Sequence, residues 1–189
     1  AVTPIVGKEI VKHLNFRSTQ TIVRFIATIT ISELKKMNKV KADIVRAIPL
    51  PPIYLKKGPV PICPANKKVK NFFNKIGSTI EIKNEKQSTN FWATSGMMAS
   101  YYEMQKVMSE WLIKKGIKRD DTQKYITSLF SALSEDAVLN SKKDLKYLVK
   151  DSQTPRGLNE QGLKQMKKRR VYKSIVNTLN SIYKRLNKK

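Results

Sequence analysis

The spacing of apolar residues changes character about halfway along the chain. In the first ninety residues, segments with helical spacing alternate with short runs rich in β-branched residues. Four of these runs are predicted strands, at 21–29, 41–48, 59–63 and 78–82. Three segments are predicted helices, at 5–14, 31–37 and 66–77. Helices that alternate with strands favour an α/β sheet with parallel strands.

Local signals add detail to this half of the chain. Ser32 is the expected N-cap of the 31–37 helix, because a serine oxygen can accept a hydrogen bond from a free N–H at a helix start. The prolines at 49–52 are expected to stop the strand before them. The prolines within 59–63 indicate an edge strand, since proline cannot donate to a β ladder.

Beyond residue 88 the spacing is helical throughout, and no further strand is expected. One long helix is predicted to end at Gly116, and the next to begin with Asp120 and Asp121 as caps. The predicted helices cover 88–116, 119–140, 144–150, 158–170 and 171–186. The expected fold is therefore α/β followed by all-α, with domains at 1–87 and 88–189.

Composition excludes several classes of protein. Hydrophobic residues make up 40% of the 189 positions, which is enough for a globular core. One cysteine, Cys63, and one histidine, His13, predict neither a disulfide framework nor a metal site. The single cysteine fits a reducing compartment, so we expect a cytoplasmic protein. No apolar run is long enough to span a bilayer, and no membrane partner is expected.

The formal net charge is +24, from 38 Lys and Arg against 14 Asp and Glu. A field of this sign attracts nucleic acid. The lysines are dispersed, however, which is typical of a solvated surface, and only Lys167–Arg170 forms a dense patch. Nucleic acid is therefore not the expected partner. The alternative, a basic helical nucleic-acid-binding protein, predicts that Lys167–Arg170 and the C-terminal lysines share one face.

Several segments, taken in order, carry a resemblance that covers essentially the whole chain. They are "AVTP" at 1–4, "FIATITISELKKM", "VRAIPLPP" at 45–52, "FFNKIGSTIEI", "IKKGIKRDDTQKY" and "TPRGLNEQGL". Their order and spacing resemble the pyrroline-5-carboxylate reductase family, from the middle of its Rossmann domain to its C-terminus. The resemblance implies a partial Rossmann NAD(P)-binding domain, a helical dimerisation and substrate domain, and a homodimer.

The resemblance also implies a reaction and a site. The family transfers hydride from a reduced nicotinamide to a cyclic imine acid, pyrroline-5-carboxylate, and so completes proline biosynthesis. By position in the motif, Asn159 stands where the family has the second of two threonines, which hydrogen-bonds the substrate. Asn159 is therefore the expected catalytic residue. The substrate-binding residues implied by the resemblance are Thr154, Gly157, Leu158, Asn159 and Ser95.

The cofactor, NADPH or NADH, is implied to lie at the ends of two sheet strands. Its expected neighbours are Val2, Thr3, Pro4, Pro49, Leu50 and Pro51. The residues themselves leave a second interpretation open, in which these prolines only terminate strands. The family's G-x-G-x-x-G turn is absent, so the chain is expected to be a fragment that is weakly active or inactive alone.

The motif at 154–161 departs from the family pattern. The paired threonines are replaced by Leu158 and Asn159, and the first of two glycines is replaced by Arg156. An arginine there could bind a carboxylate or point to solvent. Two interpretations stay open at this turn: a ligand-binding turn, or a helix start that Asn159 and Glu160 only cap. A dehydrogenase-like scaffold without catalysis is a further alternative.

Overall fold

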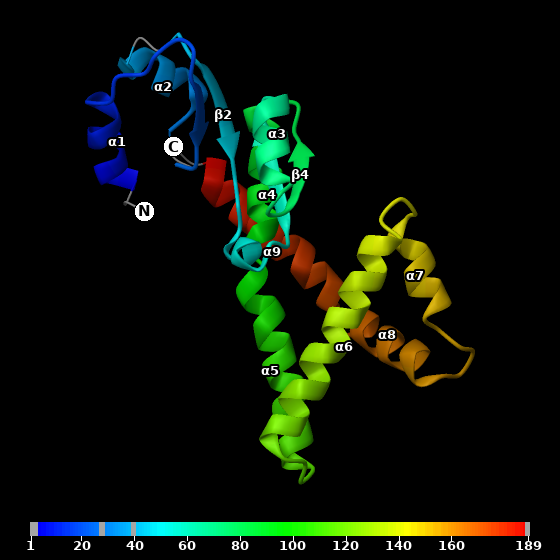
Figure 1. Ribbon diagram of the computed structural model, residues 1–189. Helices are drawn as coiled ribbons and strands as arrows, with labels where there is room; N and C mark the ends of the chain where they lie inside the picture. Colours follow the sequence, from blue (N-terminus) through cyan, green and yellow to red (C-terminus); the bar gives the residue numbers. More distant parts are fainter. Residues whose placement is uncertain (1–3, 27–28, 39–40, 188–189) are drawn as a thin grey trace. The chain divides into compact units, whose positions relative to one another are not determined.

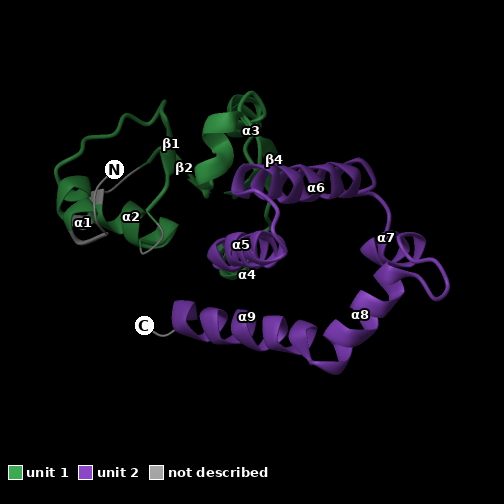
Figure 2. Ribbon diagram, turned by 90° about the horizontal axis from the view of Figure 1, so that it is seen from below, with its two compact units in different colours: residues 1–95, 189 green, residues 96–188 purple. Residues whose placement is uncertain are grey.

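The computed structural model describes residues 4–26, 29–38 and 41–187. The chain divides into two compact units, the first running to Ser95 and the second from Gly96 to Lys188 (Figure 2). The first unit is α/β and the second is all-helical, so the predicted fold class is confirmed. The expected boundary after residue 87 falls within the helix that closes the first unit.

The first unit alternates helices and strands (Figure 1). Its elements are α1 (Pro4–Lys12), β1 (Thr21–Arg24), α2 (Ile31–Asn38), β2 (Asp43–Ala47), the 3₁₀ helix η1 (Pro51–Leu55), β3 (Pro59–Cys63), α3 (Lys67–Phe73), β4 (Ser78–Glu81) and α4 (Glu85–Ser95). Each strand predicted from β-branched runs is therefore present; β3 has the predicted bounds, and the other three are shorter than predicted.

The four strands form one mixed sheet in the order β1-β2-β3-β4. β1 pairs with β2 and β3 with β4 in parallel, but β2 and β3 are antiparallel, so the prediction of a parallel sheet is wrong for that pair. The connection between β2 and β3 contains only η1, which is too short for the crossover that parallel neighbours need.

β3 lies inside the sheet, so its predicted place at an edge is also wrong. Both prolines are tolerated in this strand, because neither position has to donate a backbone N–H to a neighbouring strand. Pro59 is the first residue of the strand, and Pro61 takes part through its carbonyl, which accepts the Ile48 N–H at 3.1 Å.

Both faces of the sheet are covered. On one face a buried cluster joins strand residues to α3, and on the other a second cluster joins them to α1 and α2. The first cluster contains Val45, Ala47, Val60, Ile62, Val69 and Phe73. The second contains Val11, Ile29, Leu34, Ala42 and Ile44. Because side chains alternate between the two faces along β2, this strand contributes residues to both clusters.

The N-cap of α2 is Thr30, not Ser32 as the sequence suggested. The Thr30 Oγ1 accepts the Glu33 N–H at 3.1 Å, and the Glu33 carboxylate accepts the Thr30 N–H at 2.7 Å. This reciprocal capping box places Ser32 inside the first turn.

The second unit contains five helices among the described residues. They are α5 (Met98–Lys114), α6 (Arg119–Leu139), α7 (Leu145–Asp151), α8 (Leu158–Lys168) and α9 (Val171–Asn187). No strand follows β4 in the described part of the chain, as expected. α5 ends at a turn where Gly116 has φ of 88°, a conformation that favours glycine.

Two helix predictions need correction. The single long helix expected at 88–116 is α4 and α5, with a break at Gly96 and Met97. Asp120 and Asp121 lie in the first turn of α6 rather than at its cap, which is Lys118. In the first turn the two carboxylates still favour the helix, because they lie at the positive end of its dipole.

The second unit buries few side chains. Among its described residues, those classed as buried are Ser109, Thr122 and Ile126. The Ser109 and Thr122 hydroxyls, on α5 and α6, are hydrogen-bonded at 2.8 Å. Many large apolar side chains stay exposed, among them Trp111, Tyr125, Leu133, Val138 and Val176. None of the described helices is long and apolar enough to cross a membrane.

Candidate functional site

The segment between α7 and α8 forms a tight turn. α7 is closed by Ser152 as its C-cap, and α8 opens with Gly157 as its N-cap. The Gly157 N–H donates to the Thr154 carbonyl at 2.8 Å. Arg156 has φ of 62°, in the left-handed region that non-glycine residues rarely adopt. Arg156, which stands where the resemblance places a family glycine, therefore has a backbone conformation that glycine adopts more readily.

Gly157 is required by close packing within this turn. A Cβ at this position would lie 2.9 Å from the Thr154 carbonyl oxygen and closer still to the Thr154 Oγ1. Since the carbonyl belongs to the backbone, it cannot move aside cheaply. A side chain at this position therefore requires the turn to shift.

The polar residues that open α8 are bonded within the turn. The Asn159 Nδ2 donates to the Ser152 carbonyl at 2.8 Å, which joins the end of α7 to the start of α8. The Glu160 carboxylate accepts the Arg156 N–H at 2.6 Å and pairs with Lys164 at 2.6 Å. The pKa of Glu160 is lowered, mainly by the bond to Lys164 and next by the hydrogen bond from the Arg156 N–H.

The turn brings four predicted substrate residues together: Thr154, Gly157, Leu158 and Asn159. Leu158 exposes 86% of its surface, an unusual amount for a leucine at a predicted ligand site. Ser95 is the last residue of α4 in the other unit, where its Oγ donates to the Trp92 carbonyl at 2.7 Å. These residues stay predicted site residues.

The predicted cofactor residues fall in two places. Pro49, Leu50 and Pro51 follow β2, where Leu50 is the N-cap of η1 and Pro51 its first residue. Pro4 is the first residue of α1, while Val2 and Thr3 lie outside the described residues. The loop after β2 leaves the sheet at the same edge as the chain after β1, because these two strands are parallel.

A buried pair of arginines lies beside this edge, and the sequence analysis did not identify it. Arg24 on β1 and Arg46 on β2 are register partners, with 4% and 6% of their surfaces exposed. The Arg24 guanidinium donates to the Glu85 carboxylate and to the Ile26 and Ile29 carbonyls. It therefore connects β1, the chain that follows it and the first turn of α4.

Arg46 connects β2 to the same helix. Its Nη1 donates to the Ser88 Oγ at 2.7 Å, and its guanidinium lies 5.5 Å from the centre of the Trp92 ring. Ser88 in turn donates to the Glu85 carbonyl at 2.7 Å. Glu85, Ser88 and Trp92 follow one face of α4, so this face is fixed to the strands that carry the arginines.

This buried cluster carries more positive charge than it neutralises. Among the described residues, Arg24 Nε, Arg46 Nε and Arg46 Nη2 have no hydrogen-bond partner. Burial lowers the pKa of Arg24 to about 10, against the opposing attraction of Glu85. Burial also lowers the pKa of Arg46 and raises that of the thiol of Cys63, its register partner on β3. The cluster is a costly arrangement that depends on Glu85.

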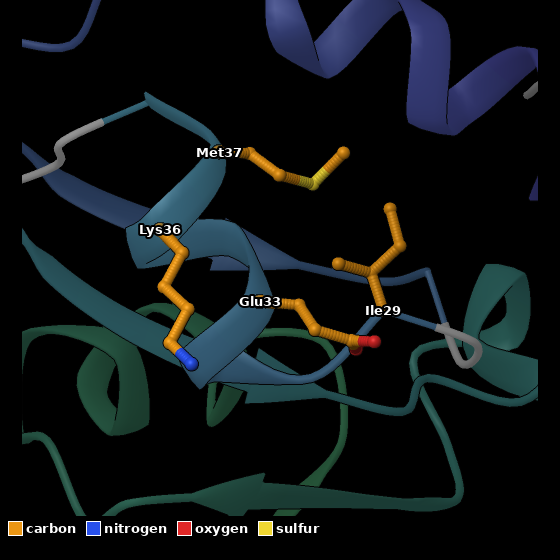
Figure 3. A pocket seen from close by; sticks show the side chains of 4 residues that line it. All are labelled: Ile29, Glu33, Lys36 and Met37. Carbon is orange, nitrogen blue, oxygen red and sulfur yellow. The ribbon is translucent and has the colours of Figure 1, made fainter.

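A pocket of about 270 Å³ lies against α2, lined by Ile29, Glu33, Lys36 and Met37 (Figure 3). None of the predicted site residues lines it. Its one carboxylate, that of Glu33, already accepts hydrogen bonds from Thr30. No group of three or more metal-ligating side chains occurs among the described residues.

The geometry defines an α/β unit with a mixed sheet followed by a helical unit with large uncovered apolar faces. Residues 85–189 match the family model described as pyrroline-5-carboxylate reductase dimerisation. The match covers more than half of the chain, and the chain belongs to the pyrroline-5-carboxylate reductase family. The resemblance inferred from the sequence is confirmed. A search of curated proteins found no match.

Solved structures of this family share the fold. The Plasmodium falciparum pyrroline carboxylate reductase with NADP bound is 20% identical with a TM-score of 0.81, covering 98% of this chain and 78% of its own. The Coxiella burnetii enzyme is 18% identical with a TM-score of 0.79, covering 97% and 70%. The Streptococcus pyogenes enzyme is 16% identical with a TM-score of 0.81, covering 98% and 73%. At these identities the likeness concerns the fold.

Proposed function

We propose that the chain is part of an NAD(P)H-dependent reductase that transfers hydride to a cyclic imine acid, with pyrroline-5-carboxylate as the expected substrate. The family match over 85–189 carries this proposal, since it includes the turn between α7 and α8. The reduced nicotinamide supplies the hydride that the imine carbon receives. The chain's own residues bind and orient the two reactants.

The loop after β2 is the proposed neighbour of the nicotinamide. Pro49 and Pro51 have no N–H, so this loop offers carbonyl oxygens and the single amide of Leu50. A nicotinamide carboxamide carries an NH₂ group that needs such acceptors, so the loop fits this end of the cofactor. The G-x-G-x-x-G turn that would hold the pyrophosphate is not in this sequence.

The turn at 154–160 is the proposed substrate site. Free N–H groups at the start of α8 favour a carboxylate, because the helix dipole is positive there. Asn159 is the proposed catalytic residue. Its Nδ2 is bonded to Ser152, so the proposed contact with the substrate uses Oδ1 or requires exchange of that bond. Glu160 already accepts the Arg156 N–H, so a substrate carboxylate would use the other N–H groups of the turn.

A homodimer is part of the proposal. The second unit leaves large apolar side chains exposed on α5, α6 and α9, and the matching family model is that of a dimerisation domain. Apolar faces of this extent are typical of surfaces that another protein covers. A second copy of the same helices supplies apolar faces of the same kind.

The test uses the full-length product of the gene and follows NADPH and NADH oxidation with pyrroline-5-carboxylate. The Asn159→Ala variant is expected to lose about a hundredfold in kcat, as when one polar group at a reacting centre is removed. Asn180→Ala, at an exposed position on α9, is the matched control and should keep full activity. Cofactor binding without turnover by the unchanged protein would contradict this substrate and favour another imine or an inactive scaffold.

A further inference from the structure

Charge is distributed very unevenly along the chain. All fourteen acidic residues lie at or before Glu160, whereas residues 161–189 contain ten lysines and arginines. This last segment contains most of α8 and all of α9. Residues 44–80 also lack carboxylates, but their seven lysines and arginines are spread over more positions, whereas this shorter segment holds ten with no carboxylate among them.

The junction between α8 and α9 concentrates this charge. Lys167 and Lys168 lie three and four residues after Lys164, so the three share one face of α8. Arg169 is the C-cap of α8, and Arg170 has φ of 58°, which turns the chain sharply into α9. All of Lys167–Arg170 are exposed, and no ion pair among the described residues involves them.

α9 separates its apolar and basic positions. Lys173 and Lys184 are eleven residues apart, about three helical turns, so they lie on the same side of the helix. Both are exposed. The opposite side holds the apolar positions, Val171, Ile175, Leu179, Ile182 and Leu186. Four of these five are already half-buried.

We propose that the basic junction between α8 and α9, formed by Lys167–Arg170, binds nucleic acid through its phosphates without reading base sequence. Each cation that contacts a phosphate releases a condensed counterion, which drives binding without further contacts. The net charge of +24 adds long-range attraction for a polyanion. This surface is separate from the turn at 154–160, so the proposal does not depend on the reductase activity.

The arrangement favours a nucleic acid over a lipid surface. A helix that lies in a membrane interface inserts its apolar face into the lipid and carries its cations on the opposite, polar face. α9 has this division, but four of its five apolar positions are already half-buried, and that side falls within the matched dimerisation region. Once the apolar side is covered, only the charged side is available for a partner.

The test is fluorescence anisotropy with labelled single-stranded DNA, duplex DNA and single-stranded RNA of mixed sequence, each between 50 and 200 mM salt (roughly the range over which phosphate contacts dominate). The variant replaces Lys167, Lys168, Arg169 and Arg170 by Gln. The matched control replaces Lys67, Lys68, Lys75 and Lys83, four exposed lysines of the first unit, by Gln. Both variants lose the same charge, and circular dichroism checks that both keep their helices.

The unchanged chain is expected to bind with a steep salt dependence. In the Lys167–Arg170 variant, the slope of log K against log salt for duplex DNA should become shallower by about 3 to 4. The control should change it by less than about 1. Equal effects of the two variants would overturn the proposal in favour of bulk charge, and so would no binding. Binding to phosphatidylserine vesicles without binding to nucleic acid would overturn it in favour of a lipid surface.

Discussion

Arg24 and Arg46 lie directly opposite each other on the parallel strands β1 and β2, and both guanidinium groups are buried. Like charges at paired positions of a sheet repel each other. The carboxylate of Glu85, in the first turn of α4, bonds to Arg24 and attracts Arg46. The two strands can therefore carry this pair only while α4 stays in place.

Replacement of Glu85 by Gln should destabilise the first unit strongly. The change removes the carboxylate that both buried guanidinium groups share, and we expect the free energy of unfolding to fall by about 2 to 4 kcal/mol. Urea denaturation measures this loss. Glu103→Gln, which removes an exposed pair with Lys106, should leave the free energy of unfolding almost unchanged, because solvent screens this pair. Equal losses in both variants would contradict a special role for Glu85.

The two glycines near the start of α8 should respond oppositely to alanine. At Gly157 a Cβ meets the Thr154 carbonyl at 2.9 Å, so Gly157→Ala should destabilise the chain by about 1 to 3 kcal/mol. At Gly162 a Cβ meets nothing within 4 Å, and alanine should stabilise the helix by about 0.5 to 1 kcal/mol. Thermal unfolding of both variants measures the contrast, and a stabilising Gly157→Ala would show that the turn is looser than described.

Arg156 should be replaceable by glycine with a gain in stability. Its φ of 62° costs a non-glycine residue about 1 kcal/mol or more, and glycine removes most of that strain. Glycine also gives the unfolded chain more conformational freedom, which offsets part of this gain. We therefore expect the free energy of unfolding, measured in urea, to rise by about 0.5 kcal/mol. Arg169→Gly, where φ is −78°, is the control and should lower stability. A loss at both positions would contradict strain at Arg156.

The turn before α8 should loosen in acid. The pKa of Glu160 is lowered from its usual 4.5 by Lys164 and by the Arg156 N–H, so the charged carboxylate is favoured by folding. Its contribution is complete above pH 4.5 and is lost as the pH falls through the lower folded value. The Arg156 amide resonance, followed by NMR, should titrate below pH 4.5 and become insensitive to pH in Glu160→Gln. A midpoint above that value would contradict the observed contacts.

Much of the fold could be predicted because its elements have strong local patterns. β2 and α9 are examples, since β2 is centred on two adjacent β-branched residues and α9 repeats apolar residues at helical spacing. The antiparallel β3 was missed because strand direction depends on how the chain returns to the sheet, which a periodicity does not report. The break at Gly96 and Met97 was missed for a related reason: apolar residues continue through it.

The buried arginines left a signal that was overlooked. The segments Ile22–Val23–Arg24 and Ile44–Val45–Arg46 repeat the same three residues, and the two copies pair in register. A buried charged residue at the same place in two strands requires a counterion from elsewhere in the chain. Pattern reasoning located the turn at 154–160, but the bonds that Asn159 and Glu160 make within it follow only from the three-dimensional contacts.

The sparse interior of the helical unit makes its stability a property of concentration. With Ser109, Thr122 and Ile126 as its buried described residues, a single copy of this unit gains little from folding alone. If most of its apolar burial comes from association, folding and assembly are one equilibrium. The melting temperature of the helices should therefore rise with protein concentration, and dilution should favour their unfolding.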